Sequence, residues 1–495
     1  MTAPTTSQLV QRVWNLAHVL RNDGVGSSDY LEQLTFLLFL KMVDEQHTEF
    51  GDDDLPRIPE ELSWSSLRVL DGVDLEIQYR RILTDLSTSE GLLGVIFRRA
   101  QNKITEPANL KRLVNLIDQQ EWTRLPFDVK GEIYEGLLQK NAEDIKGGAG
   151  QYFTPRPLID AMVEIVQPQP GETIADPACG TGGFLLAARE YLVKHFTLDP
   201  IEKDFLRNET FYGSDIVDSV VRLAAMNMFL HDIGGQSTPI HREDSLQRAP
   251  SQRFDIVLAN PPFGVKGGMI VLGEDGTLER EKAEYSRDDF TAKTANKQLN
   301  FLQHIISMLK IGGRAAVVVP DNVLFEGGAG EIVRRRLLKD CDLHTILRLP
   351  TGIFYAQGVK ANVLFFERRT SSETHHTRET WVYDLRTNKH FTLKTNPLKR
   401  ADLQDFVDAY RAGDFAGRVE GERFKKFPLA DLLARDKVNL DVFWLKDESL
   451  EDGENLPEPG VLAAEIIENL EAALEEFRQV AMDLGAVDFD AAADD

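Results

Sequence analysis

Cysteine is scarce in this chain of 495 residues, which contains two, Cys179 and Cys341. Two cysteines are too few for a disulfide framework, so we expect free thiols in a reducing compartment. Long apolar runs are missing as well. The longest, at residues 34–40, is far shorter than the roughly 20 residues of a membrane span. Together with the lack of a basic and apolar leader, these features predict a cytoplasmic protein with no membrane partner.

Net positive charge is also lacking. The formal net charge is −24, and residues 447–495 carry −15 of it through sixteen acidic side chains and one basic side chain. The other 446 residues still carry −9, whereas a protein that holds nucleic acid by itself normally clusters lysine and arginine on one face. The composition therefore argues against a self-sufficient nucleic-acid-binding surface.

Hydrophobic periodicity divides the chain into three regions. Residues 1–147 have apolar positions at helical spacing, which predicts a helical N-terminal domain. In residues 148–370, short apolar strands alternate with helices, which predicts an α/β catalytic domain with a doubly wound, mostly parallel, Rossmann-like sheet. The C-terminal region, residues 371–495, ends in an acidic segment with apolar residues at helical spacing, where we expect a helical tail that docks on a partner. The expected strands include residues 174, 211, 256–258, 315–319, 346–349 and 363–366.

A glycine-rich turn follows the first expected strand. Its sequence, from Asp176 to Gly183, is Asp-Pro-Ala-Cys-Gly-Thr-Gly-Gly, and a helical pattern begins directly after it. Glycines let the backbone approach a nucleotide-type ligand closely. The acid Asp176 would repel a pyrophosphate but suits the cationic amino-acid part of S-adenosylmethionine. The turn therefore predicts a site for that cofactor.

Two further acids occupy the ends of expected strands. Asp215 follows the run that begins at Phe211, which places a carboxylate where ribose hydroxyl groups would bind. Asp244 would end a third strand and accept a hydrogen bond from the adenine amine of the cofactor. A surface acid at the start of a loop fits Asp244 equally well.

The segment before the glycine turn is a glycine-rich loop with two aromatic residues. It runs from Gly147 to Pro157, where a proline near the first turn of the next helix marks the helix start. Such a loop can fold over a cofactor as a lid, or it can serve as an interdomain linker.

The tetrapeptide Asn260-Pro261-Pro262-Phe263 follows the apolar run 254–259. At the carboxyl end of a strand it presents a side-chain amide oxygen, a backbone carbonyl and an aromatic face. Two such acceptors can take both protons of an exocyclic base amine, whose lone pair is otherwise delocalised into the ring, while the aromatic ring stacks on the base. A plain turn is the alternative, because Asn-Pro commonly begins turns.

These segments together resemble the DNA adenine methyltransferases, and most closely the modification (M) subunit of type I restriction-modification systems. Further likeness lies at residues 347–354 and 362–366. The resemblance implies that S-adenosyl-L-methionine is bound by Gln151, Tyr152, Phe153, Thr154, Pro155, Arg156, Thr181, Gly182, Gly183 and Asp215, with weaker support for Asp244. It implies that Asn260, Pro261, Pro262 and Phe263 hold the target base. Some relatives have Glu at the position of Asp215, which leaves the role of that residue less secure.

The function implied by this resemblance is transfer of a methyl group to N6 of a flipped adenine in double-stranded DNA, without a metal. Because the chain is acidic, we expect DNA contact and sequence choice to come largely from another subunit. The resemblance implies that this is a separate specificity (S) subunit, with two M subunits to one S subunit, and that a restriction (R) subunit is a further candidate partner. The alternatives are a cytosine-N4 methyltransferase, a methyltransferase of protein glutamine or RNA guanine, and an inactive scaffold subunit. Cytosine C5 chemistry is disfavoured because neither cysteine adjoins the tetrapeptide.

Overall fold

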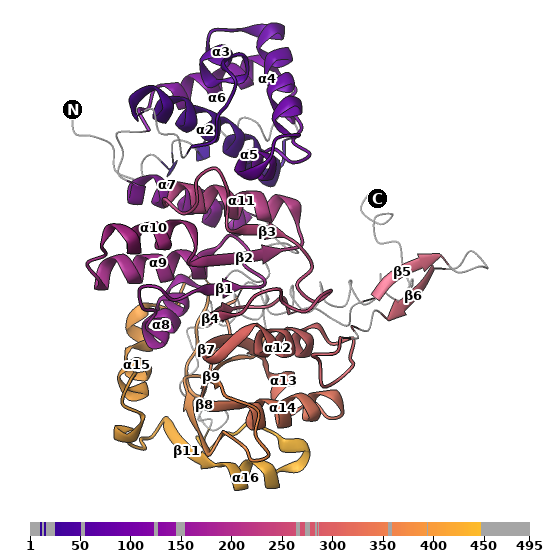
Figure 1. The fold of residues 1–495 in the computed structure, drawn as a ribbon, viewed down its shortest axis with the longest axis vertical. Helices are drawn as coiled ribbons and strands as arrows, with labels where there is room; N and C mark the ends of the chain where they lie inside the picture. Colours follow the sequence, from indigo (N-terminus) through magenta and orange to yellow (C-terminus); the bar gives the residue numbers. More distant parts are fainter. Residues whose placement is uncertain are drawn as a thin grey trace, which may run out of the picture.

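The computed structural model describes residues 10–11, 14–15, 25–50, 55–122, 127–144, 154–263, 268–272, 278–282, 285, 287–354, 359–393 and 395–446. The long axis of the molecule follows the strand order of one large sheet (Figure 1). The N-terminal helices lie at the end of this axis beside β3, and β11 and α16 lie at the other end. The acidic segment 447–495, where we expect a helical tail, falls outside the described residues.

The N-terminal region is helical, as predicted. Apolar residues at helical spacing form its core, and α4, for example, buries Leu75, Tyr79, Ile82, Leu83 and Leu86 along one face. The helices are α2 (Ser27–Phe50), η1 (Glu60–Leu62), α3 (Trp64–Arg68), α4 (Gly72–Leu86), α5 (Gly91–Ile96), α6 (Pro107–Asp118) and α7 (Phe127–Asp144).

A nine-stranded sheet forms the rest of the core, in the order β11-β10-β8-β9-β7-β4-β1-β2-β3. Five of its neighbouring pairs are parallel, and the antiparallel pairs are β7–β9, β8–β9 and β10–β11. The prediction of a mostly parallel α/β sheet is therefore confirmed. The strands are β1 (Ile174–Asp176), β2 (Phe211–Asp215), β3 (Ile240–Arg242), β4 (Phe254–Ala259), β7 (Leu309–Pro320), β8 (Cys341–Arg348), β9 (Ala361–Arg368), β10 (Glu379–Asp384) and β11 (Phe424–Pro428). Separate from this sheet, β5 (Gly268–Leu272) pairs with β6 (Leu278–Lys282).

Both faces of the sheet are buried. Along β4, Ile256 and Leu258 belong to one hydrophobic cluster, whereas Val257 and Ala259 belong to another. Strands covered on both faces have continuous apolar sequences because successive side chains point to opposite sides. The covering helices are α8 (Arg156–Val166), α9 (Gly183–His195), α10 (Pro200–Asn208), α11 (Asp218–Leu230), α12 (Lys297–Met308), α13 (Asp321–Phe325) and α14 (Ala329–Asp340), and the C-terminal part adds η2 (Arg400–Leu403), α15 (Gln404–Tyr410), η3 (Phe415–Gly417), α16 (Leu429–Ala434) and η4 (Asp436–Val438).

The side chain of Arg222 joins the sheet region to the N-terminal helices. It projects from α11, is 3% exposed, and donates to the carbonyl oxygens of Ile96 and Arg98, each at 2.6 Å. It also forms an ion pair with Glu32 and lies 5.0 Å from the ring centre of Phe36. These four contacts of the guanidinium all lie in the N-terminal region, which fixes that region against α11.

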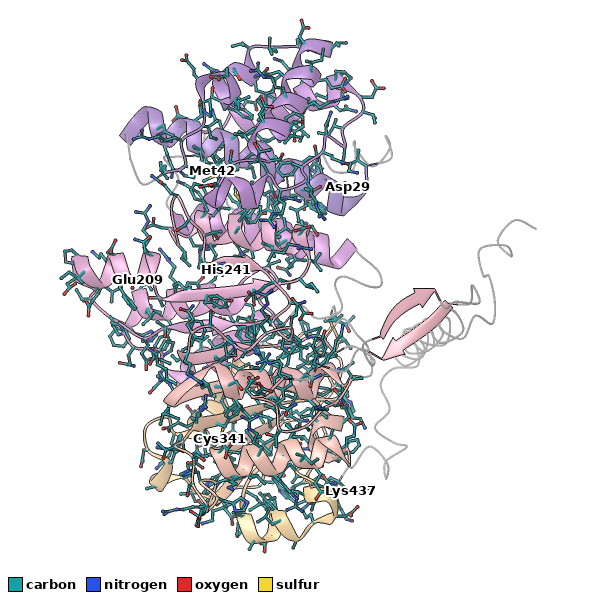
Figure 2. All side chains as sticks on the ribbon, turned by 45° about the vertical axis from the view of Figure 1, so that its right-hand side comes forward. Asp29, Met42, Glu209, His241, Cys341 and Lys437 are labelled. Atoms are coloured by element: carbon teal, nitrogen blue, oxygen red, sulfur yellow. The ribbon has the colours of Figure 1, made fainter. Side chains whose placement is uncertain are left out.

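Both cysteines are buried free thiols, as expected. Figure 2 places Cys341 within the part of the sheet that lies farther from the N-terminal helices. Burial raises the pKa of Cys341 to about 12 and that of Cys179 well above its ordinary value, so both stay protonated. Within the described residues, no helix combines the length and the apolarity needed to cross a bilayer.

Candidate active site

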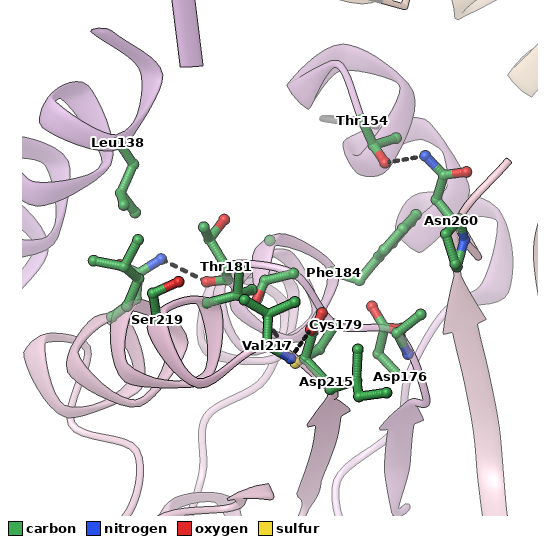
Figure 3. Close-up of a pocket in the computed structure, with 18 of the residues that line it drawn as sticks. Leu138, Thr154, Asp176, Cys179, Thr181, Phe184, Asp215, Val217, Ser219 and Asn260 are labelled. Carbon is green, nitrogen blue, oxygen red and sulfur yellow. Dashed lines mark hydrogen bonds between the residues drawn. The ribbon is translucent and has the colours of Figure 1, made fainter. Parts of the chain in front are cut away.

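A cavity of about 1180 Å³ lies at the carboxyl ends of β1, β2 and β4. Figure 3 shows Asp176, Asp215 and Asn260 at the tips of three strands around it. The N-terminal region supplies part of the wall through Gln101, Lys103 and Leu138. The predicted residues that line the cavity are Thr154, Pro155, Arg156, Asp176, Thr181, Gly183, Asp215, Asp244, Asn260 and Pro262, and Gly182, Pro261 and Phe263 lie next to them in the chain. Gln151, Tyr152 and Phe153 fall outside the described residues.

The side chain of Asn260 is held by Thr154. Its amide nitrogen donates to the Thr154 hydroxyl at 2.8 Å, across 106 positions of sequence, and Asn260 is 7% exposed. Figure 3 shows the amide oxygen on the side of the amide away from Thr154. The hydrogen bond therefore fixes the orientation of the Asn260 amide, and with it the position of the amide oxygen that can accept a hydrogen bond.

An aromatic pair adjoins the tetrapeptide. The ring of Phe263 meets that of Phe354 edge to face, with centroids 5.8 Å apart and an interplanar angle of 82°. Phe354 is buried, and its neighbour Ile353 lines the cavity. The likeness at residues 347–354 therefore corresponds to the end of β8 and the start of a loop that supports the ring of Phe263.

The glycine turn has the backbone conformation that its sequence predicts. Gly180 and Gly182 have φ angles of +54° and +85°, and Gly182 is the N-cap of α9. A Cβ atom on Gly182 would lie 2.5 Å from Cε of Met228, whereas one on Gly180 would meet nothing within 4 Å. The lack of a side chain at Gly182 thus lets Met228 pack against the turn. Gly180 lines the cavity with backbone atoms alone.

Asp176 is a buried carboxyl group, 1% exposed, at the end of β1. One oxygen accepts a hydrogen bond from the backbone N–H of Ala178 at 3.0 Å. Burial, with a smaller contribution from the nearby Asp215, raises the pKa of Asp176 to about 8. In the absence of a cation this acid is therefore mostly protonated at neutral pH.

Replacing Asp176 with asparagine is expected to stabilise the ligand-free protein increasingly as pH rises. The unfolded acid ionises near pH 4, but the folded one stays neutral up to about pH 8, so wild-type stability falls across this interval. The loss is about 1 kcal/mol per pH unit, and the asparagine side chain of the variant does not titrate. Thermal unfolding at pH 5 and pH 8 measures the difference in Tm between the two proteins. An equal difference at both pH values would contradict the assigned pKa.

Asp215 and the two residues after it form the next part of the wall. One carboxylate oxygen accepts from the N–H of Val217 at 3.0 Å, and burial raises the pKa of Asp215. Ile216 and Val217 line the cavity with 58% and 46% of their surface exposed. An acid beside exposed aliphatic side chains suits a ligand with hydroxyl groups joined to a planar ring.

Asp244 lies two residues after β3 and also lines the cavity. It accepts hydrogen bonds from the N–H of Leu246 at 3.0 Å and from the hydroxyl of Tyr285 at 3.3 Å. Tyr285 lines the cavity but was not predicted. No local sequence pattern indicates Tyr285, because this residue follows Asp244 by 41 positions and only the folded structure brings the two side chains together.

Arg156 is engaged by three carboxylates. Its guanidinium contacts Asp160 at 3.0 Å, Glu135 at 3.3 Å and Glu190 at 2.6 Å. Glu135, Glu190 and His231 also have ligand atoms within 4.8 Å of one another, an arrangement that can hold a metal ion. Because Arg156 forms ion pairs with both of those glutamates, we assign the cluster to holding α7, α8 and α9 together.

Asn227 is a second residue that the sequence did not reveal. It lines the cavity, is 1% exposed, and its amide nitrogen donates to the carbonyl oxygen of Thr181 at 3.0 Å. Among the described residues its amide oxygen has no hydrogen-bond partner. A buried acceptor of this kind normally has a partner, so Asn227 offers an acceptor to a ligand.

Two family models match the chain. The N-6 DNA Methylase model matches residues 126–442, and the HsdM N-terminal domain model matches residues 9–119. The mostly parallel sheet, the cavity at its carboxyl edge and these matches define the class of protein, an N-6 DNA methylase.

Similar proteins along the whole chain are subunits of type I restriction enzymes. The StySJI methylase subunit of Salmonella typhimurium is 39% identical, over 97% of this chain and 96% of that protein. The EcoKI M protein, known from a crystal structure, is 35% identical over 97% of both chains, with a TM-score of 0.53. A chain from a solved structure of a type I restriction-modification system has a TM-score of 0.73 and is 28% identical, over 98% of this chain and 100% of that chain. The chain therefore belongs to the type I restriction enzyme methylase subunits, which are adenine-specific DNA methyltransferases.

Proposed function

We propose that the cavity binds S-adenosyl-L-methionine and that Asn260, Pro261, Pro262 and Phe263 hold a flipped adenine beside it. The observation that carries this proposal is that one cavity joins Asn260 to Asp176 and Asp215. A base acceptor at one end and acids suited to a cationic, hydroxyl-rich ligand at the other would bring a base amine to the methyl donor.

The residues present fit the cofactor. Asp176 and the amide oxygen of Asn227 would accept from its ammonium group, Asp215 from its ribose hydroxyls, and Asp244 from its adenine amine, and the unfilled space beside Gly180 leaves room for the ligand. When bound, S-adenosylmethionine supplies a methyl group on a positively charged sulfur, which an electron-rich nitrogen can take directly. Thr181, Gly182 and Gly183 would let the backbone approach the ligand.

The residues at the other end of the cavity would prepare the base. Adenine rotates out of the duplex at a cost of a few kcal/mol and lies against the ring of Phe263. The amide oxygen of Asn260 and the carbonyl oxygen of Pro261 would accept hydrogen bonds from the two N–H groups of the base amine, which concentrates the lone pair on nitrogen. Thr154 keeps the Asn260 oxygen oriented for this task by holding the amide nitrogen.

We further propose that a specificity subunit supplies sequence choice and much of the DNA contact, with two copies of this chain to one such subunit in the cytoplasm, and that a restriction subunit can join. The net charge of −9 outside residues 447–495 supports a partner that contributes basic surface. The acidic segment 447–495 has the apolar spacing of a helix that docks on a partner.

Co-expression with a candidate specificity subunit tests this function. Mapping of modified bases in the host DNA should reveal N6-methyladenine at a single recognition sequence, and the modification should disappear when either subunit is omitted. Detection of N4-methylcytosine instead would show that the base-binding residues hold cytosine and not adenine. Failure of the purified chain to bind S-adenosylhomocysteine by calorimetry would indicate a scaffold.

A further inference from the structure

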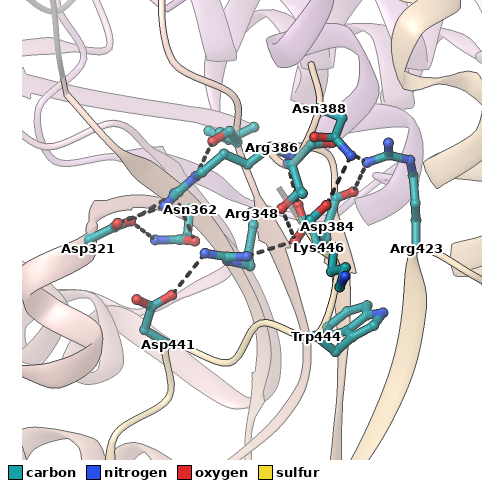
Figure 4. A network of polar contacts seen from close by, with 12 residues as sticks. Asp321, Arg348, Asn362, Asp384, Arg386, Asn388, Arg423, Asp441, Trp444 and Lys446 are labelled. Carbon is teal, nitrogen blue, oxygen red and sulfur yellow. Dashed lines mark hydrogen bonds and ion pairs between the residues drawn. The ribbon is translucent and has the colours of Figure 1, made fainter. Parts of the chain in front are cut away.

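Arg386 makes a dense set of polar contacts at the carboxyl edge of the sheet, two residues after β10 (Figure 4). Its guanidinium donates to the carbonyl oxygens of Leu349 and Ala361, each at 2.8 Å. It also forms a bidentate ion pair with Asp321, at 2.7 and 2.8 Å. The Arg386 side chain is 12% exposed, so these contacts lie largely inside the protein.

The two carbonyl groups mark the two ends of one loop. Residues 349–360 connect β8 to β9, and the structure describes 349–354 and 359–360 of them. The N–H of Leu349 donates to the carbonyl oxygen of Ala361, the first residue of β9, at 3.0 Å. Arg386 therefore binds the loop where it leaves the sheet and where it returns. Within this loop, Ile353 lines the cavity and Phe354 contacts the ring of Phe263.

The surrounding groups keep Arg386 in place. Asn362 donates to a carboxylate oxygen of Asp321 at 2.8 Å, and the N–H of Arg386 donates to the carboxylate of Asp384 at 2.9 Å. Asp384 is fully buried and forms an ion pair with Arg348 at 2.8 Å. A partly buried arginine with matched acceptors on every side holds one orientation, because displacement would leave charges uncompensated.

We propose that Arg386 is a positioning residue for the target base, which it acts on through Phe354. It binds Leu349, where the loop leaves β8, and Ala361, where β9 begins, and so anchors the described stretch 349–354 that carries Phe354. Through the edge-to-face contact, Phe354 in turn sets the position of the Phe263 ring. This inference rests on the proposed role of Phe263 as the surface on which the base lies.

The chain contains a matched control for this proposal. Arg314 on β7 has the same kinds of partner: the carbonyl oxygens of Val166 and Gln167 at 2.8 and 2.9 Å, and a bidentate pair with Glu172 at 2.7 and 2.8 Å. Its partners lie at the end of α8 and just before β1, away from the cavity. Lysine at either position can keep the ion pair, but its single ammonium group cannot reproduce the planar fork that also reaches both carbonyl oxygens.

The experiment compares Arg386→Lys with Arg314→Lys in the complex with the specificity subunit. We expect kcat for Arg386→Lys to fall about 10-fold, as for a misplaced catalytic group, with affinity for S-adenosylhomocysteine unchanged. The fluorescence of 2-aminopurine at the target position, which reports a base outside the stack, should rise less than with the wild type. Arg314→Lys should match the wild type in all three measurements. Equal loss in the two variants, or an equal fall in cofactor affinity, would overturn the proposal.

A double-mutant cycle with Phe354→Ala separates positioning from general stability. If Arg386 acts through Phe354, Arg386→Lys should lower kcat by less than about 2-fold in the Phe354→Ala background. A further 10-fold loss there would show that Arg386 acts by another route. A wild-type complex that methylates no DNA would instead refute the proposed function, so the two failures are distinguishable.

Discussion

Replacing Asn260 with alanine is expected to lower the rate of adenine methylation by about 10³-fold, the upper range for losing a transition-state hydrogen-bond partner. The change removes the side-chain acceptor for the amine protons but leaves the acids of the cofactor end untouched. Single-turnover methylation by the complex with the specificity subunit gives the rate, and calorimetry with S-adenosylhomocysteine should give the wild-type affinity.

The partner of Asn260 provides a graded comparison. Thr154→Val removes the hydroxyl that holds the amide nitrogen but keeps the size of the side chain, so the amide can rotate between two orientations. We expect a loss of about 10-fold, between wild type and Asn260→Ala. An Asn260→Ala complex that methylates as fast as the wild type would refute the assigned role of the tetrapeptide.

The Asp215→Ala variant is expected to bind the cofactor about 100-fold more weakly. A charged acceptor that binds ribose hydroxyl groups contributes about 1.5–3 kcal/mol for each hydrogen bond. Calorimetry with S-adenosylhomocysteine measures the affinity, and the methylation rate at saturating cofactor should change much less.

Glu209→Ala is the matched control for Asp215→Ala. It removes an exposed carboxylate from the connection that leads into β2, six residues before Asp215. Its affinity for S-adenosylhomocysteine should equal that of the wild type. If both variants bind S-adenosylhomocysteine equally well, Asp215 does not contact the ribose, and the role proposed for it at the end of β2 is wrong.

The residues that sequence reasoning located share a physical property. Asp176 and Asp215 are the last residues of β1 and β2, and Asn260 follows β4 directly. Each therefore has a local signal, an apolar strand that ends in a polar side chain, and parallel strands bring such ends to one edge. The α/β sheet with its helical N-terminal region was predictable for the same reason, because periodicity is local.

Residues that act through distant contacts carry no such signal. Tyr285, Asn227 and Arg386 look like ordinary loop or helix positions, and the hydrogen-bond partners of their side chains are 41, 46 and at least 24 positions away. Likewise, β10 and β11 join the sheet although they lie after residue 370, where the sequence pattern gave no strand. Arg156 could be placed at the cavity from sequence, but its three carboxylate partners could not.

Arg222 has a practical consequence for anyone who trims this polypeptide or builds hybrids with its relatives. Without the first 122 residues, a cation would protrude from α11 with none of its oxygen partners, next to apolar surface stripped of its cover. A shortened catalytic fragment would tend to aggregate, and a chimera would need Glu32 and the stretch 96–98 transplanted together with Arg222. The N-terminal helices and the sheet therefore form one structural unit.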